Sequence, residues 1–187
     1  MLLQPSLFAD PSLPEGFRYQ DDFLSPEEEV GLIGRFAELP FKPFEFQQYL
    51  GKRQVVYFGH RYDYQKGALQ VADDLPVWLR PVRERAAAFA GLAPERLAQA
   101  MVTEYDIGAP IGWHRDRPQF EDVIGISLAS PCTFRFRRKR GEGWQRASLI
   151  ARPRSIYLLR GPARDEWQHS IPPVSERRFS ITFRTFR

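Results

Sequence analysis

The sequence predicts an α+β domain, mainly β, in which two helices cover one face of an antiparallel sandwich or barrel. Two segments with helical spacing of apolar residues lie in the first half of the chain, and short alternating segments fill the second half. Sixteen prolines and thirteen glycines favour many turns and short strands over a helical bundle. A length of 187 residues fits one domain, so we expect 1–187 to form a single unit.

Both expected helices have clear signals at their ends. Ser25 is followed three residues later by Glu28, the spacing of a capping box, and the apolar periodicity that follows ends near Leu39. The second helix is expected to begin after Asp74 and to stop at Gly91, because glycine tolerates the left-handed conformation that ends helices. A short helical turn is expected at 94–97.

The expected strands are short, and glycine or proline lies in or near most of the gaps between them. Two of them come early in the chain and six follow Gln99. Their ranges are 16–23, 54–58, 100–105, 123–129, 133–137, 144–150, 155–159 and 178–184.

Composition excludes several classes of protein. Hydrophobic residues make up 43% of the chain, which is enough for a buried core, so extensive disorder is not expected. The single cysteine excludes an internal disulfide framework and a Cys-x-x-Cys zinc site, and it suits a reducing cytoplasm. No apolar run is long enough to span a membrane, and the opening residues lack the basic region of a signal peptide. We therefore expect a cytoplasmic protein without a membrane partner, and a monomer.

Positive charge is concentrated at the end of the chain. Residues 135–187 hold 14 Lys/Arg against 4 Asp/Glu, whereas residues 1–134 hold 13 against 19. Such a basic half indicates a polyanionic partner, although solvated strand faces paired with the acidic half are an equally good explanation.

Three histidines occur in the chain, and two of them suggest a metal site. His114 and Asp116 are two residues apart, which places both side chains on one side of an extended backbone, and His169 follows 53 residues later. Two imidazoles and one carboxylate are the ligand set of non-haem Fe(II) oxygenases. The pair alone is weak evidence, because a histidine beside an aspartate is more often a surface coincidence.

The segment 178–184 alternates strictly between apolar and polar residues. Arg178, Ser180, Thr182 and Arg184 therefore share one face of a strand. They form either the solvated face of an edge strand or a pair of arginine clamps for the two ends of a dicarboxylate.

These features resemble the AlkB-like family of 2-oxoglutarate/Fe(II) dioxygenases over roughly residues 17–185. No single motif is specific, but their order and spacing together are. The segments that carry the resemblance are Tyr105-x-x-Gly108, His114-x-Asp116, the apolar stretch 123–128, the stretch 153–159, the stretch 167–171 around His169, and Arg178-x-Ser180-x-Thr182-x-Arg184.

The resemblance implies a double-stranded β-helix (jelly-roll) core with two supporting N-terminal helices. It implies that His114, Asp116 and His169 bind Fe(II), and that the protein uses 2-oxoglutarate and O₂ to demethylate alkylated bases oxidatively in DNA or RNA, with tRNA as one candidate. Formaldehyde, succinate and CO₂ would be the products.

The resemblance also assigns the cosubstrate contacts. Arg178, helped by Tyr105 and Ser180, would bind the distal carboxylate of 2-oxoglutarate, and Arg184 would lie near the metal-bound end. Thr103 and Ser180 stand where well-studied members have asparagine, which implies a shorter hydrogen-bonding reach.

Another departure concerns the target base. Pro118 stands where members of the family often have an acidic residue that holds the base, and Glu121 or Asp122 could substitute for it. This departure puts the base preference in doubt more than the chemistry.

Two segments are candidates for contact with the substrate. Residues 41–70 are rich in aromatic and basic side chains and resemble a nucleotide-recognition lid, in which Tyr57, His60 and Tyr62 would stack on or near an unstacked base. Packing of these aromatics between helices and sheet is the alternative.

The segment 135–140 carries five cations in six residues and is the best candidate for phosphate contacts, through Arg137, Arg138 and Arg140. A solvated turn is the alternative there. For the whole chain, two other functions remain open: a hydroxylase of the same fold acting on protein or a small molecule, and a catalytically silent RNA-binding module.

Overall fold

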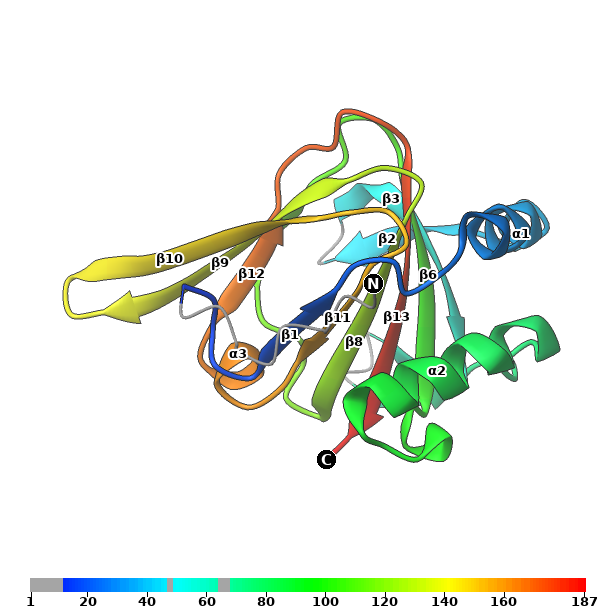
Figure 1. The fold of residues 1–187 in the computed structure, drawn as a ribbon, viewed down its shortest axis with the longest axis horizontal. Coiled ribbons are helices and arrows are strands. Elements are labelled where there is room, and N and C mark those ends of the chain that lie inside the picture. The colour runs from blue at the N-terminus through cyan, green and yellow to red at the C-terminus, as the bar shows by residue number, and fades with distance from the viewer. Residues whose placement is uncertain (1–11, 47–48, 64–67) are drawn as a thin grey trace, which may run out of the picture.

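The computed structural model describes residues 12–46, 49–63 and 68–187 as two facing antiparallel sheets with two helices outside them (Figure 1). In spatial order the larger sheet contains β1 (Phe17–Gln20), β11 (Ile156–Leu159), β8 (Phe120–Leu128), β13 (Arg178–Phe186), β6 (Gln99–Tyr105), β3 (Tyr49–Phe58) and β2 (Lys42–Phe46). The smaller sheet contains β10 (Gly143–Ala151), β9 (Cys132–Arg140), β12 (Gln168–Ile171) and β7 (Ile111–His114). A separate hairpin joins β4 (His60–Asp63) to β5 (Ala68–Val71). The predicted mainly-β jelly-roll architecture is confirmed.

The helices follow the predicted end signals closely. In α1 (Pro26–Phe36), Ser25 and Glu28 form both hydrogen bonds of a capping box. Helix α2 (Arg80–Ala90) stops at Gly91, which has a φ of 68°. The prediction placed the start of this helix too early, since Val77–Leu79 is a 3₁₀ turn. A regular helix beginning at Arg80 keeps Pro81 in its first turn, where the missing N–H costs no hydrogen bond.

Two further short elements complete the chain. Another 3₁₀ turn covers Pro94–Arg96, and a one-turn helix, α3 (Pro162–Asp165), precedes β12. No described helix is long and apolar enough to cross a membrane.

The two helices cover the outer face of the larger sheet (Figure 1). Leu32 and Phe36 of α1 and Ala86 of α2 share one buried cluster with Ile124 of β8 and Ile181 of β13. A fully buried aliphatic or aromatic side chain contributes roughly 1.5–3 kcal/mol. This packing fixes the larger sheet in place, so that its opposite face can present polar residues to the smaller sheet.

Strand β13 lies in the middle of the larger sheet, between β8 and β6. Its apolar residues Phe179, Ile181 and Phe183 pack on the helix side. Arg178 and Arg184 therefore point into the space between the two sheets, and Arg178 is fully buried. The solvated edge-strand interpretation of 178–184 is thus wrong.

The smaller sheet ends in a long hairpin formed by β9 and β10, which reaches away from the body of the molecule (Figure 1). At its base, Phe134 and Phe136 pack on Phe17 of the larger sheet. The space between the sheets closes with these aromatics on one side and stays open beside β7.

Candidate iron and cosubstrate site

His114, Asp116 and His169 come together at the open side of the space between the sheets. One ligand atom of each residue lies within 4.8 Å of the others. The two histidines are direct partners in the β7–β12 ladder, with ring centroids 4.3 Å apart, and Asp116 follows on the loop after β7. Antiparallel pairing therefore joins residues that are far apart in the sequence into one cluster that could hold a metal ion.

Neighbouring groups orient each ligand. Nδ1 of His114 donates to the carbonyl oxygen of Gly112 at 2.9 Å, which leaves Nε2 available to a metal. The ring of His169 stacks on Phe134 with centroids 5.4 Å apart. These contacts fix both imidazoles before any ion binds.

The charge states of the cluster also suit a divalent cation. Burial lowers the pKa of both histidines, and His114 helps to lower the pKa of His169 to about 3. Burial alone would raise the pKa of Asp116, but Arg184 and the two histidines outweigh it and hold that pKa well below its usual range. Neutral imidazoles with an ionised carboxylate are the protonation states that metal binding requires.

Arg184 holds the carboxylate from the side opposite His169. Its Nε donates to Oδ1 of Asp116 at 2.7 Å, and its Nη1 donates to Gln99 at 3.0 Å. Oδ2 of Asp116 lies 3.5 Å from Nε2 of His169. One oxygen of Asp116 is thus occupied by arginine, while the other faces the histidines.

A cavity of about 590 Å³ opens beside this cluster. Both sheets line it, and the loop after β7 forms part of its rim. Its size is that of a small-molecule site, with room for a cosubstrate and a substrate group. Members of the cluster and of the predicted cosubstrate set that line it are His114, Asp116, His169, Tyr105 and Arg184.

Arg178 is the residue best suited to bind an anionic cosubstrate. Its side chain is completely buried, and Nη2 donates to Ser127 at 3.0 Å. Within the described part of the chain, Nε and Nη1 have no hydrogen-bond partner, and no acidic side chain pairs with this guanidinium. An unpaired buried charge is strongly destabilising, so the site calls for a bound carboxylate.

The other predicted cosubstrate residues surround Arg178. Its guanidinium lies 4.6 Å from the ring centroid of Tyr105, whose hydroxyl is 3.2 Å from Ser180. Thr103 is the ladder partner of Ser180, and its buried hydroxyl has no hydrogen-bond partner in the described part of the chain. These arginine and hydroxyl groups, buried behind the cavity wall next to Tyr105, suit the distal carboxylate of 2-oxoglutarate.

The predicted substrate residues are more scattered. Tyr57 on β3 lines the cavity. His60 does not: it contacts the carbonyl of Ala98 at 3.1 Å and the ring of Phe186. Glu121 is exposed and pairs with Arg96 at 3.1 Å, outside the cavity wall. The side chain of Tyr62, the third predicted stacking residue, lies outside the described residues.

The predicted lid, 41–70, is only partly a separate structure. Strand β3 pairs along its length with β6, so β2 and β3 extend the larger sheet. Phe44, Arg53 and Tyr57 from these strands form one wall of the cavity. Only β4 and β5 form an independent hairpin.

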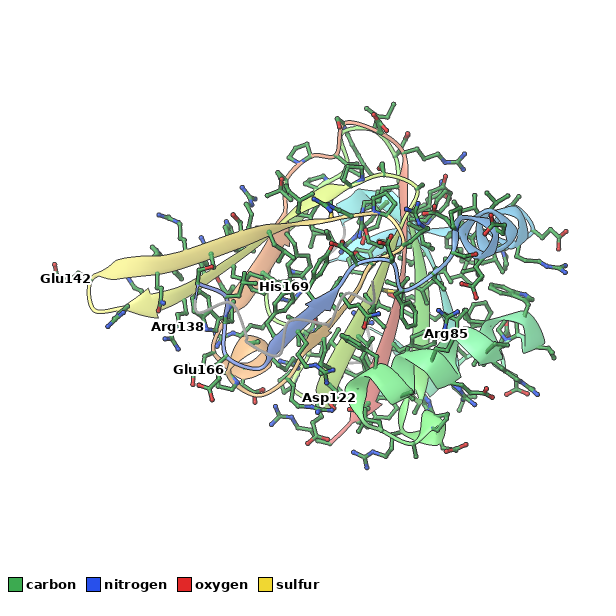
Figure 2. All side chains as sticks on the ribbon, in the orientation of Figure 1. Arg85, Asp122, Arg138, Glu142, Glu166 and His169 are labelled. Carbon is green, nitrogen blue, oxygen red and sulfur yellow. The ribbon has the colours of Figure 1, made fainter. Side chains whose placement is uncertain are left out.

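The three predicted hairpin cations do not share one surface. Arg137 lies between the rings of Trp113 and Trp144, at 4.5 and 4.3 Å from their centroids. Arg138 points to the opposite face, where it pairs with Glu166 at 2.7 Å (Figure 2). Arg140 is exposed beside the turn.

Sequence reasoning missed several cavity residues. Arg53 and Tyr157 both line the cavity without having been named as site residues. The two-residue period of strands could have found Arg53, because it lies on the same face of β3 as Tyr57. Ser127, which binds Arg178, follows the same rule within the apolar stretch 123–128.

Comparisons with known proteins agree with this geometry. A family model described as the 2OG-Fe(II) oxygenase superfamily matches residues 16–184. The "Alkylated DNA repair protein ALKBH8 homolog" of Arabidopsis thaliana is 32% identical over 174 residues, covering 74% of this chain. The "tRNA (carboxymethyluridine(34)-5-O)-methyltransferase alkbh8" of Xenopus tropicalis is 27% identical over 176 residues, covering 91% of this chain. The chain spans 50% and 27% of the length of these two relatives.

Solved structures share the fold. "The structure of OsALKBH1" matches with a TM-score of 0.72 at 15% identity, covering 91% of this chain and 96% of that one. A prolyl-4-hydroxylase from Pseudomonas putida matches with a TM-score of 0.59 at 15% identity, covering 92% and 93%. At such identities these likenesses establish the double-stranded β-helix and no more.

The family match covers nearly the whole chain, and the clustered ligand set and the unpaired Arg178 suit the family's metal and cosubstrate. The chain therefore belongs to the 2OG-Fe(II) oxygenase superfamily, whose cofactor and cosubstrates are Fe(II), 2-oxoglutarate and O₂, and it is similar to AlkB homologues.

Proposed function

We propose that this oxygenase demethylates alkylated bases in DNA or RNA. The observation that carries the proposal is a surface of cations and tryptophans that starts at the rim of the cavity. Its members, which we call the outer hairpin face, are Arg135, Arg137, Lys139, Trp144 and Arg146.

Strand alternation builds this surface. Arg135, Arg137 and Lys139 are alternate residues of β9, and Trp144 and Arg146 are the ladder partners of Lys139 and Arg137. None of the four cations pairs with an acidic side chain in the described residues. Cations without acidic partners beside an exposed tryptophan are what a nucleic-acid strand binds, through phosphate contact and base stacking.

Trp113 connects the outer hairpin face to the cavity. The guanidinium groups of Arg135 and Arg137 lie 5.0 and 4.5 Å from its ring centroid. Trp113 also lines the cavity, one residue before His114. A strand bound along the hairpin would therefore run to the opening beside the predicted iron ligands.

The roles that we assign to the chain's residues follow from their positions. His114, Asp116 and His169 would hold Fe(II), which with 2-oxoglutarate and O₂ supplies the oxidation of a C–H bond. Arg178 would bind the distal carboxylate of 2-oxoglutarate and so set its orientation. Hydroxylation of an N-methyl group gives a hydroxymethyl amine, which releases formaldehyde and restores the base, while 2-oxoglutarate leaves as succinate and CO₂.

Mass spectrometry of products tests this proposal. The wild type would be incubated with Fe(II), 2-oxoglutarate and a panel of methylated DNA and RNA oligonucleotides, with Asp116→Ala as the matched inactive control. Loss of a methyl group from at least one oligonucleotide, in the wild type only, is expected. Turnover of 2-oxoglutarate with no change in any oligonucleotide would favour a hydroxylase of protein or small molecules instead.

A further inference from the structure

The cavity is unusually rich in positive charge. Four arginines line it: Arg53, Arg115, Arg117 and Arg184. Asp116 is the one acidic residue among the described residues of the wall, and Arg184 already occupies one of its oxygens.

Bound Fe(II) and 2-oxoglutarate do not change the net positive charge of the cavity. Fe(II) adds two positive charges, and 2-oxoglutarate removes two. Arg178, buried behind the wall, adds a further positive charge. Asp116 and Arg184 cancel one another, so that Arg53, Arg115 and Arg117 keep the wall positive.

Arg53 is the best placed of these to meet a substrate. Its guanidinium lies 3.9 Å from the ring centroid of Phe44, and both residues line the cavity together with the iron-site loop. Arg115 is partly engaged, donating to the carbonyl of Asp165 at 3.0 Å. A guanidinium offers donors only, so it pairs with carbonyl or anionic oxygens and repels a cation.

Alkylated bases fall into two charge classes. Methylation at N3 of cytosine or N1 of adenine leaves a cationic base at neutral pH, whereas methylation at N3 of uracil or thymine leaves a neutral base with two carbonyl oxygens. A cationic base beside the arginine wall would meet repulsion with no acidic side chain in the described wall, other than Asp116, to offset it.

Resting on the proposed function, we infer that the substrate is an alkylated base without positive charge, of the carbonyl-rich uracil type, and that Arg53 selects it. The cavity wall thereby excludes cationic methylated bases. Pro118 contributes to the same result, because it lines the cavity without supplying a carboxylate.

A matched pair of substrates tests this inference. Two RNA oligonucleotides that differ only in carrying 3-methyluracil or 3-methylcytosine share the methyl position and the ring size but differ in charge. Turnover is measured as demethylated base by mass spectrometry. Binding is measured with Mn(II) in place of Fe(II), so that affinity is obtained without turnover.

We expect the 3-methyluracil oligonucleotide to be favoured about tenfold or more in binding and in kcat/KM, which corresponds to about 1.4 kcal/mol. Arg53→Glu should lower this preference for 3-methyluracil or reverse it, and Arg53→Gln should lower it less. Arg35→Gln, an exposed substitution on α1, should leave the preference unchanged. Raising the pH until 3-methylcytosine loses its proton should bring the two affinities together in the wild type.

Equal or tighter binding of the 3-methylcytosine oligonucleotide would overturn the inference, whether or not either base is demethylated. An unchanged ratio in Arg53→Glu would overturn the role of Arg53. Demethylation of the cationic base alone would contradict the inference and leave the proposed function intact. Selective binding of 3-methyluracil without demethylation would support the inference and contradict the proposed function.

Discussion

Arg184 donates from Nε to Oδ1 of Asp116 at 2.7 Å, joining the central strand of the larger sheet to a predicted iron ligand on a loop. Without this contact, Asp116 would keep only its loop and its longer, 3.5 Å approach to His169 for orientation. Arg184 is itself held by Gln99 and stacks near Phe120, with its guanidinium 5.2 Å from that ring centroid. The sheet therefore sets the direction in which the carboxylate faces the histidines.

Removing this contact should weaken metal binding. Arg184→Ala is expected to lower the affinity for a divalent metal roughly 10- to 100-fold, the usual cost of removing a residue that orients a ligand. Calorimetric titration with Mn(II) measures this. The control is Arg187→Ala, which removes an exposed pair with Asp165 and a hydrogen bond to the carbonyl of Phe120, and should leave the affinity unchanged. Wild-type affinity in Arg184→Ala would mean that other contacts orient Asp116.

Removal of any ligand should abolish turnover without unfolding the protein. His114→Ala, Asp116→Ala and His169→Ala are each expected to stop succinate formation, because two remaining ligands hold the metal poorly. Their circular dichroism should match that of the wild type, since the cluster lies beside a cavity rather than in the helix-side core. Normal 2-oxoglutarate turnover in any of the three would remove that residue from the ligand set.

Arg178 is expected to lower the stability of the protein without ligand and to be required for binding of 2-oxoglutarate. Arg178→Met is expected to keep or raise Tm, because the buried guanidinium lacks an acidic partner among the described residues. In the wild type, 2-oxoglutarate at about 100 Kd should stabilise the metal-loaded fold by about 2.7 kcal/mol. Arg178→Met should show no such shift, and Arg178→Lys, which lacks the fork, should show a smaller one. A full ligand-induced shift in Arg178→Met would contradict the assigned role.

Gly125 should tolerate no side chain while Tyr157 is present. A Cβ at Gly125 would lie 2.1 Å from Cζ of Tyr157, which lines the cavity next to it. Gly125→Ala is therefore expected to cost about 1–3 kcal/mol in the free energy of unfolding. Denaturant titration of Gly125→Ala, Tyr157→Val and the double variant measures the coupling, and additive effects would show that the tyrosine can move aside at no cost.

The outer hairpin face and the opposite face of the same hairpin offer a matched pair of variants. Changing Arg137, Lys139 and Arg146 to glutamine should weaken binding of every oligonucleotide alike. The slope of log affinity against log salt concentration should become shallower by about 0.7–0.9 for each phosphate that the variant no longer neutralises. Changing Arg138 and Arg140 on the opposite face should have a smaller effect. Equally weakened binding in both variants would mean that the phosphate contacts are not confined to the outer hairpin face.

The local sequence pattern was sufficient to predict which residues share the inner face of β13. Strict alternation in 178–184 placed Arg178 and Arg184 on one side of a strand, because strand side chains alternate in any sheet. Whether that side met solvent or protein could not be read locally. It depends on pairing with Tyr105 and with Ser127, which lie on distant segments of the chain.

The same rule applied more fully would have improved the prediction for the hairpin. Arg137 and Arg138 are adjacent in a strand, so they had to face opposite ways. Alternation would have grouped Arg137 with Arg135 and Lys139. The ion-pair partners of these side chains could not be predicted from the sequence. Glu121 pairs with Arg96, and Arg138 with Glu166, only because distant segments meet in the fold.

The cosubstrate residues illustrate what a motif resemblance adds. Tyr105, Ser180 and Thr103 carry no strong local signal. Only their order in the sequence relative to the metal ligands suggested that they share a site. The fold brings them around Arg178 through the β6–β13 ladder. The charge of the cavity wall, by contrast, emerged only once β3 and the loop after β7 were seen to line the same cavity.

The most direct test of the account is the coupling of the two half-reactions on one oligonucleotide. Succinate and demethylated base would be quantified together, over time, with wild-type enzyme and a methylated RNA oligonucleotide. The account predicts equimolar succinate and restored base, with both absent in Asp116→Ala. Succinate formed at the same rate with and without oligonucleotide, and no restored base, would contradict it.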